Sequence, residues 1–69
     1  MRISARNQLR GTVTNVSRGA SIANVELDVA GQRIVASITV EAVDDLGLGQ
    51  GDEVVAIIKA SDVMIAVDG

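Results

Sequence analysis

Apolar and polar residues alternate along the first half of the chain, and this alternation predicts β-strands. The clearest case is IANVELDV at 22–29, in which every second residue from Ala23 onward is apolar and the residues between are Asn, Glu and Asp. The run LRGTVTNV at 9–16 has the same period of two, which places alternate side chains on opposite faces of a strand. Gly11 within it is typical of a bend or bulge. Two half-buried strands are therefore expected, joined by a turn within NVSRGAS at 15–21.

The residues from 30 to 47 predict a hairpin turn, a third strand and one short helix. AGQ at 30–32 is typical of a tight turn, and RIVASI at 33–38 continues as a strand. Thr39 is a favourable N-cap, and Gly47 suits the left-handed position that follows a last helical turn. The helix between them is expected to place Val40, Val43 and Leu46 on one face.

The last third of the chain predicts two more strands, and both are apolar on both faces. These are DEVVAIIKA at 52–60 and SDVMIAV at 61–67. A strand of this kind needs a cover on each face, which one short chain cannot supply, so we expect a subunit interface. The order of three strands, one helix and two strands matches an all-β, OB-fold-like five-stranded barrel with one short helix between strands 3 and 4, assembled as an oligomer.

The composition narrows the possible functions. The 69 residues, which make a single domain over 1–69, include no Cys, His, Phe, Tyr or Trp. Without Cys or His there is no disulfide, no thiolate metal site and no imidazole base. The absence of aromatic rings and the net charge of −3 argue against nucleic-acid binding. A chain this short has a marginal core of its own, which again favours an oligomer.

No segment of the sequence is expected to enter a membrane. MRISARNQL at the N-terminus lacks the apolar run of a secretory signal. Nowhere is there an apolar run of about 18 residues, the length that a membrane-spanning helix needs. We therefore expect a cytoplasmic protein.

Two basic segments are candidates for binding an anion. Lys59 ends the apolar fourth strand, where its ammonium either reaches solvent from the strand end or supplies an anion-binding charge in a dry setting. In SARN at 4–7, the Ser, Arg and Asn side chains either tie down an N-terminal arm or form an oxyanion cradle together with backbone N–H groups. The sequence pattern alone leaves both alternatives open.

Two further positions could either serve local structure or bind an anion, whereas the acidic residues offer no good candidate for a binding site. Thr39 caps a helix, but the free N–H groups of a helix start also attract anions. SRGAS at 17–21 is either a plain turn or a nest of N–H donors. Asp44-Asp45 and Asp52-Glu53 are poor candidates for a metal cation, because the first two diverge on a helix and the others open a strand. No nucleophile–base pair or phosphate-binding glycine motif occurs, so no catalytic residue is assigned.

Three segments together resemble the molbindins. They are SARNQLRGTV at 4–13, ITVEAVDDLGLGQGDEV at 38–54 and AIIKASDVMIA at 56–66, and they cover essentially the whole chain in order. Molbindins are small molybdate-binding proteins built from a single Mop-type domain, the transport-associated OB-fold (TOBE). The resemblance implies an OB-like subunit in a homo-hexamer, a trimer of dimers, which binds molybdate or tungstate at subunit interfaces without an organic cofactor.

The resemblance also implies a function and a set of site residues. The expected function is non-enzymatic storage and homeostasis of the oxyanion, and the alternative is a regulatory or interaction module that reports oxyanion occupancy to a partner. The implied site consists of Ser4, Ala5, Arg6, Lys59 as the principal charge, Ala60 and Ser61, with Thr39 approaching from a neighbouring subunit. A second class of oxyanion site is matched to Gly19, Ala20 and Ser21.

Overall fold

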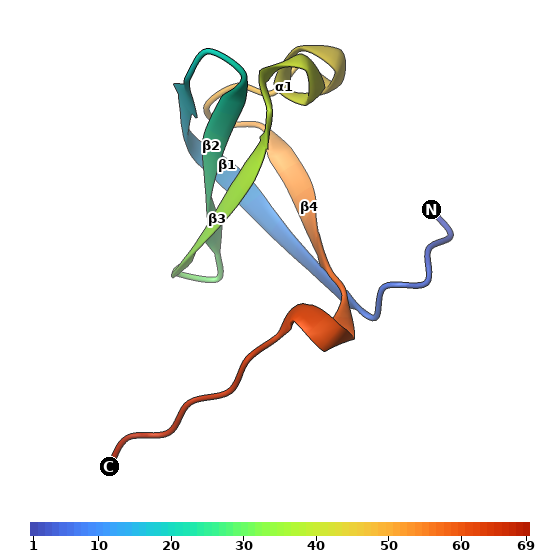
Figure 1. The fold of residues 1–69 in the computed structure, drawn as a ribbon, viewed down its shortest axis with the longest axis vertical. Helices are drawn as coiled ribbons and strands as arrows, with labels where there is room; N and C mark the ends of the chain where they lie inside the picture. Colours follow the sequence, from blue (N-terminus) through green and yellow to red (C-terminus); the bar gives the residue numbers. More distant parts are fainter.

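The alternating segments form one curled antiparallel sheet with the strand order β3-β2-β1-β4, and a short helix lies at one end of it (Figure 1). The computed structural model describes residues 1–69. The elements are β1 (Asn7–Arg18), β2 (Ile22–Val29), β3 (Gln32–Thr39), α1 (Val40–Leu46), β4 (Glu53–Ile58) and a single 3₁₀ turn at Ala60–Asp62. All strands but the predicted fifth are confirmed.

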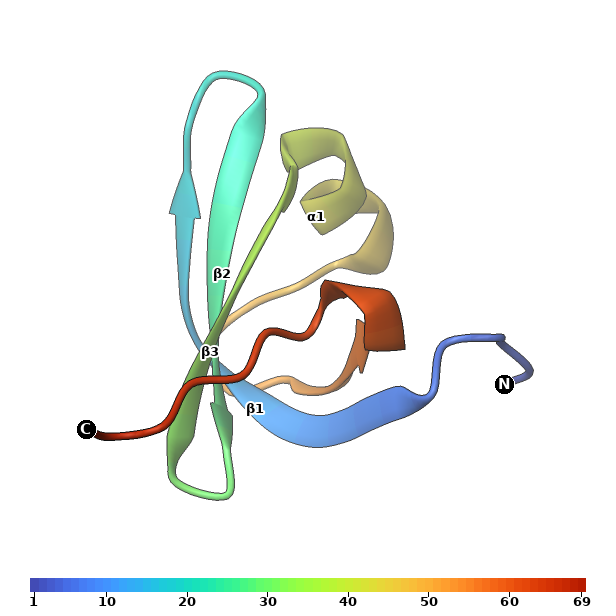
Figure 2. The same cartoon turned by 60° about the horizontal axis from the view of Figure 1, so that its bottom comes forward.

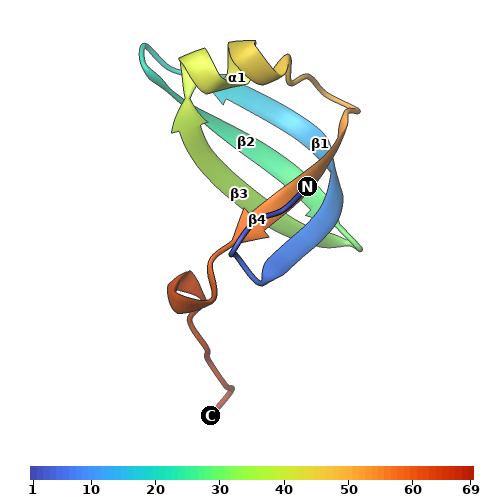
Figure 3. The same cartoon turned by 90° about the vertical axis from the view of Figure 1, so that its right-hand side faces the viewer.

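The long strand β1 holds the sheet together, because it pairs with a different strand along each half. Its first half pairs with β4 and its second half with β2, and Thr12 takes part in both pairings. Figure 3 shows β1 passing from one partner to the other. A Cβ at Gly11 would lie 2.7 Å from the carbonyl oxygen of Asp28, so glycine permits this close crossing. The register then shifts between Val13 and Asn15, so the strand contains a bulge, but it lies beyond Gly11, the position that the sequence suggested.

The hairpin from β2 to β3 turns at Ala30 and Gly31. Val29 pairs with Gln32, so the loop contains only these two residues. Both have positive φ, 50° and 84°, as a two-residue turn requires when its twist matches that of the flanking strands. The predicted tight turn is therefore confirmed, with Gln32 as the first residue of the strand that follows.

The helix α1 begins and ends at the predicted residues. Thr39 Oγ1 accepts a hydrogen bond from the Ala42 N–H at 3.0 Å, and Gly47 has φ 64°. Val43 is buried, whereas Leu46 is 69% exposed. Val40 also packs against the core, so the predicted face contacts the sheet through its first two residues and not through Leu46.

The core is small and wholly aliphatic. It consists of five buried residues on the concave face of the sheet and on α1, and each is a Val, Ala or Leu. The period-two pattern of β2 accounts for three of them. The core residues are Val13, Ala23, Val25, Leu27 and Val43. Five buried side chains in a chain of 69 residues provide little apolar burial.

The structure differs from the predicted five-stranded barrel at the C-terminus. After the 3₁₀ turn, residues 63–69 run away from the sheet and form no strand (Figure 1). A strand needs a neighbour to pair with, and residues 64–69 donate no backbone hydrogen bond within the chain. The result is a four-stranded sheet with β3 and β4 as free edges. None of the helices has the length and apolar character needed to cross a membrane.

Candidate functional site

The pairing of β1 with β4 brings the two basic segments of the sequence together. Asn7, the first residue of β1, pairs with Ile58, the last residue of β4. Ser4–Arg6 therefore enter the sheet, and Lys59–Ser61 leave it, at the same place (Figure 1). We call these six residues the donor end. Two segments more than fifty residues apart in the sequence are thus neighbours in the fold, as the candidate site requires.

The polar side chains of the donor end have no partner within the chain. The ion pairs of the chain are Arg18–Asp44 and Arg33–Glu26, so neither Arg6 nor Lys59 takes part in one. No side-chain hydrogen bond involves these two residues or the hydroxyls of Ser4 and Ser61. The backbone N–H groups of residues 4–6 also donate to no other group. The donor end is therefore a cluster of unused hydrogen-bond donors with two unpaired positive charges.

The 3₁₀ turn fixes the second segment of the donor end. The Asp62 N–H donates to the Lys59 carbonyl at 2.9 Å, and the Val63 N–H donates to the Ala60 carbonyl at 3.3 Å. Lys59 itself has extended backbone angles, φ −64° and ψ 136°. These bonds use carbonyl groups of the segment and leave the Lys59 ammonium and the Ser61 hydroxyl available. The chain thus presents residues 59–61 in a defined conformation.

Thr39 and the turn at Gly19–Ser21 lie together at the opposite end of the sheet, which we call the helix end. Thr39 pairs with Ile22, and the Val40 N–H donates to the Ser21 carbonyl at 2.9 Å. The Gly19 N–H closes the turn onto the Ile22 carbonyl at 2.8 Å. In Figure 2 this turn and the start of α1 lie side by side. The structure therefore joins Thr39 to the residues of the predicted second site.

The charges of the helix end are mainly negative, and its one cation is paired. A hollow of about 590 Å³ lies there, lined by Ala20, Ser21, Thr39, Val40, Glu41, Asp44 and Asp45. Arg18 lies nearby, but its guanidinium donates to the Asp44 carboxylate at 2.8 Å. The carboxylates give this end the opposite electrostatic character to the donor end.

A single chain does not complete the predicted site. Six of its seven residues lie at the donor end, whereas Thr39 lies beside α1 at the other end of the sheet (Figure 1). The length of β1 separates the two ends, because Asn7 starts that strand and Arg18 ends it near the helix. Thr39 therefore cannot contact the same ion as Lys59 unless it comes from another copy of the chain.

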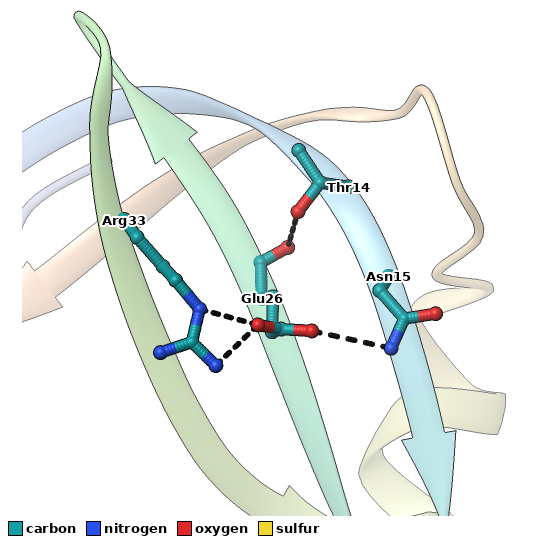
Figure 4. A network of polar contacts seen from close by, with 4 residues as sticks. All are labelled: Thr14, Asn15, Glu26 and Arg33. Carbon is teal, nitrogen blue, oxygen red and sulfur yellow. Dashed lines mark hydrogen bonds and ion pairs between the residues drawn. The ribbon is translucent and has the colours of Figure 1, made fainter.

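The middle of the sheet carries a polar network that the sequence analysis did not identify (Figure 4). On the convex face, the Glu26 carboxylate accepts hydrogen bonds from Arg33 and from Asn15, the latter at 3.2 Å, and the Thr14 hydroxyl donates to the Glu26 carbonyl. The bonds from Arg33 and Asn15 hold the pKa of Glu26 below its ordinary value. The opposite charges of Glu26 and Arg33, on the two strands of one predicted hairpin, could have indicated this network. Because Arg33 is used here, it is not a free anion-binding cation.

The remaining surface features include an apolar groove but no cation site. A groove of about 880 Å³ lies beside β4, and its lining includes Leu46, Leu48, Val55 and Ile57. No group of three or more Asp or Glu side chains is placed to hold a metal ion. Asp52 instead accepts the Gly49 N–H at 2.8 Å within its own turn. Asp52 thus serves local structure.

Comparisons with known proteins show the family of this chain. The TOBE domain family model matches residues 3–65. The chain is 46% identical to molybdenum-pterin-binding protein 3 of Clostridium pasteurianum over 66 residues, which cover 94% of this chain and 97% of the relative. Its structure is similar to that of a molybdate-binding protein from Sporomusa ovata, with a TM-score of 0.93 and 39% identity, covering 97% of this chain and all of that one.

A third relative has been solved with its ligand. This is the cytoplasmic molybdate-binding protein ModG with molybdate bound, which matches with a TM-score of 0.84 and 43% identity, covering 87% of this chain and 43% of that one. The resemblance noted in the sequence is thus confirmed by a family model, by a relative of the same length and by solved structures. The chain belongs to the TOBE-domain family and is similar over nearly its whole length to the small molybdenum-pterin-binding proteins of that family.

Proposed function

We propose that the protein binds molybdate or tungstate without catalysing a reaction, at interfaces between its own subunits, and so stores and buffers the oxyanion in the cytoplasm. The observation that carries this proposal is the donor end, where Ser4–Arg6 and Lys59–Ser61 meet with their donors and charges unused. The named molybdate-binding relatives support the same ligand class.

The chemistry of the donor end suits a tetrahedral dianion. Each oxygen of such an ion accepts hydrogen bonds from several directions, and hydroxyl, N–H and ammonium groups can supply them. Charge-assisted hydrogen bonds of this kind are roughly twice as strong as neutral ones. The Lys59 ammonium and the Ser4 and Ser61 hydroxyls are unpartnered here. We therefore assign Lys59 as the principal charge, with Arg6 either touching the ion or serving the interface.

The same proposal requires more than one subunit, and we propose a hexamer built as a trimer of dimers. The core of one chain is small, while the apolar tail at residues 63–67 is strongly exposed, with Met64 at 93% and Ile65 at 86%. The groove beside β4 is a second exposed apolar surface. We assign these two surfaces to contacts between copies. Assembly would also allow Thr39 of one copy to reach the donor end of another, where burial strengthens each hydrogen bond.

A second, weaker class of site is proposed at Gly19, Ala20 and Ser21. Its support is the turn beside Thr39, which opens onto the hollow of the helix end. The carboxylates of Glu41, Asp44 and Asp45 line the same hollow and repel a dianion. We therefore expect this site to bind more weakly than the donor end and to gain from a higher salt concentration, which screens the repulsion.

Native mass spectrometry of the protein with and without molybdate tests the proposal. We expect an oligomer that takes up several oxyanions, with sulfate as the competitor of equal charge and shape. A monomer that takes up no oxyanion would contradict the proposal. A single class of bound ion, together with binding of a partner protein only when the ion is present, would instead identify a sensing module.

A further inference from the structure

The junction between the two segments of the donor end is held by one side chain. Asn7 Nδ2 donates a hydrogen bond to the Ile58 carbonyl oxygen at 3.1 Å, and the bond joins residues 51 positions apart in the sequence. The other side-chain hydrogen bonds link β1 to β2, β2 to β3 or residues around α1. The Asn7 bond is thus the only one made by a side chain between β1 and β4.

The bond from Asn7 lies at the end of the β1–β4 ladder, where it can oppose opening of the sheet. Asn7 and Ile58 form the last pair of the β1–β4 ladder, and the ends of such ladders open more readily than their centres. Beyond this pair the chain leaves the sheet in both directions, toward Arg6 and toward Lys59. A bond at the last pair therefore opposes opening at the point from which both donor segments extend.

The surroundings of Asn7 favour a lasting bond. Asn7 and Ile58 are half-buried, whereas Arg6 and Lys59 on either side of them are exposed. A hydrogen bond that is partly sheltered from water is less easily replaced by a bond to solvent. The exposed side chains that would meet an ion are thus attached to a half-buried, hydrogen-bonded pair.

We propose that Asn7 is a positioning residue, which holds Ser4–Arg6 and Lys59–Ser61 at a fixed separation so that the two segments can bind one oxyanion together. The proposal rests on the proposed function, since it assigns a role within the same site. Asn7 does not touch the ion. It lowers the conformational entropy that the two segments would otherwise lose when they close on the ligand.

The experiment combines molybdate affinity with amide hydrogen exchange on the full-length oligomer. Asn7→Leu keeps the size of the side chain and removes its donor. Asn15→Leu is the matched control, because Asn15 lies in the same strand and donates through the same atom, but to Glu26 in the middle of the sheet. Asn7→Gln keeps an amide donor on a longer side chain and tests recovery. If Asn7→Leu does not fold, Asn7→Ala removes the donor without adding apolar bulk.

Loss of the donor is expected to affect the donor end selectively. In Asn7→Leu the hydrogen-bonded amides of Asp62 and Val63, in the 3₁₀ turn that follows the last β1–β4 pair, exchange about three- to tenfold faster, and molybdate affinity falls by a similar factor, which is the range that one hydrogen bond accounts for. Asn7→Gln restores part of both, and Asn15→Leu changes neither. Equal exchange and equal affinity in Asn7→Leu and Asn15→Leu would overturn the proposal while leaving the proposed function intact.

The exchange measurement also separates this proposal from the proposed function. If the wild-type protein bound no molybdate, the proposed function would fail. The exchange of the Asp62 and Val63 amides without any oxyanion would still show whether Asn7 holds the two segments together.

Discussion

The donor end and the helix end of the sheet contain similar residue types in opposite electrostatic states. Each has a hydroxyl side chain, an arginine and backbone N–H groups near a turn, and the sequence marks both as candidates for binding an anion. At the donor end Arg6 and Lys59 are unpaired. At the helix end Arg18 is paired with Asp44, and the Thr39 oxygen already accepts the Ala42 N–H. Whether a group can bind an anion therefore depends on its partners in the fold as well as on its residue type.

The comparison also explains why one chain would make only part of the proposed site. The donor end has free donors but lacks Thr39, and the helix end has Thr39 but an excess of carboxylates. If the proposed assembly brings one end of a copy to the other end of its neighbour, positive and negative regions meet. Experiments that separate the two ends, remove single groups from them or alter the sheet between them test this arrangement.

The largest effect is expected when the two ends can no longer meet. Met64→Asp combined with Ile65→Asp places two charges in the exposed apolar tail, and burying an unpaired charge at an interface is strongly unfavourable. We expect the oligomer to dissociate to monomers and the affinity for molybdate to fall by about 100-fold or more. A loss of about 2.8 kcal/mol in the free energy of binding corresponds to that factor. Native mass spectrometry measures both.

The control for the tail variant adds the same charge elsewhere. Ser17→Asp combined with Gln50→Asp introduces two carboxylates at exposed polar positions, and it should leave assembly unchanged. An oligomer that survived the tail substitutions would show that residues 63–67 do not form the contact between copies.

Removal of the principal charge is expected to weaken binding without affecting the fold. In Lys59→Ala the exposed ammonium is lost and no ion pair or side-chain hydrogen bond is broken. A hydrogen bond to a charged group contributes about 1.5–3 kcal/mol, so molybdate affinity should fall about 10- to 100-fold. Isothermal titration calorimetry measures the affinity, and circular dichroism checks the fold.

Arg33→Ala is the matched control, because it removes the same charge from the chain but at the Glu26 network. Its affinity should stay close to that of the wild type. Equal affinities in Lys59→Ala and Arg33→Ala would show that the total charge of the chain, rather than Lys59, governs uptake.

Substitutions at Thr39 separate helix capping from contact with the ion. Thr39→Ala loses the cap and should lower the free energy of unfolding by about 1 kcal/mol. Thr39→Asp caps about as well as Ser or Asn but places a carboxylate where the proposed site needs a donor. We expect it to keep most of the stability and to lose about tenfold in molybdate affinity. Urea unfolding and titration calorimetry give the two quantities.

Thr39→Ser retains both the cap and the hydroxyl, so it should behave like the wild type. If Thr39→Asp bound molybdate as tightly as Thr39→Ser, the residue would be a cap alone. The neighbouring subunit would then contribute something other than Thr39 to the ion.

Local patterns predicted the first four strands and the helix, because each is set by neighbouring residues. The alternation of β2 identified its buried face, and Thr39 and Gly47 identified both ends of α1. The exposure of Leu46 and the absence of the predicted fifth strand could not be seen in such local patterns. Helical spacing cannot show how far a helix reaches across a sheet, and an apolar pattern cannot show whether a strand has a neighbour to pair with.

The candidate site could be predicted only in part for a similar reason. The sequence identified SARN and Lys59 as candidates for binding an anion. Their proximity in the fold depends on the pairing of Asn7 with Ile58, which joins distant parts of the chain. The pairing of Arg18 with Asp44 also arises from the fold, where the β1–β2 hairpin lies beside α1. Whether a charged side chain is paired or free therefore follows from the tertiary structure, even though the residue itself can be read from the sequence.

The smallest effect is expected at the Glu26 network, which lies between the two ends. Hydrogen bonds from Arg33 and Asn15 lower the pKa of Glu26 below its ordinary value of 4.5, so the folded state binds the proton more weakly than the unfolded chain. The stabilisation is therefore complete above that ordinary value and is lost as the pH falls through the lowered pKa. Urea unfolding at fixed protein concentration should show the wild type more stable than Glu26→Gln at neutral pH, with the difference shrinking in acid and in about 1 M salt, which screens the exposed pair. Because neither end includes Glu26, molybdate affinity at neutral pH should be the same in both proteins. A loss of molybdate affinity in Glu26→Gln would mean that a change in the middle of the sheet alters binding at its ends.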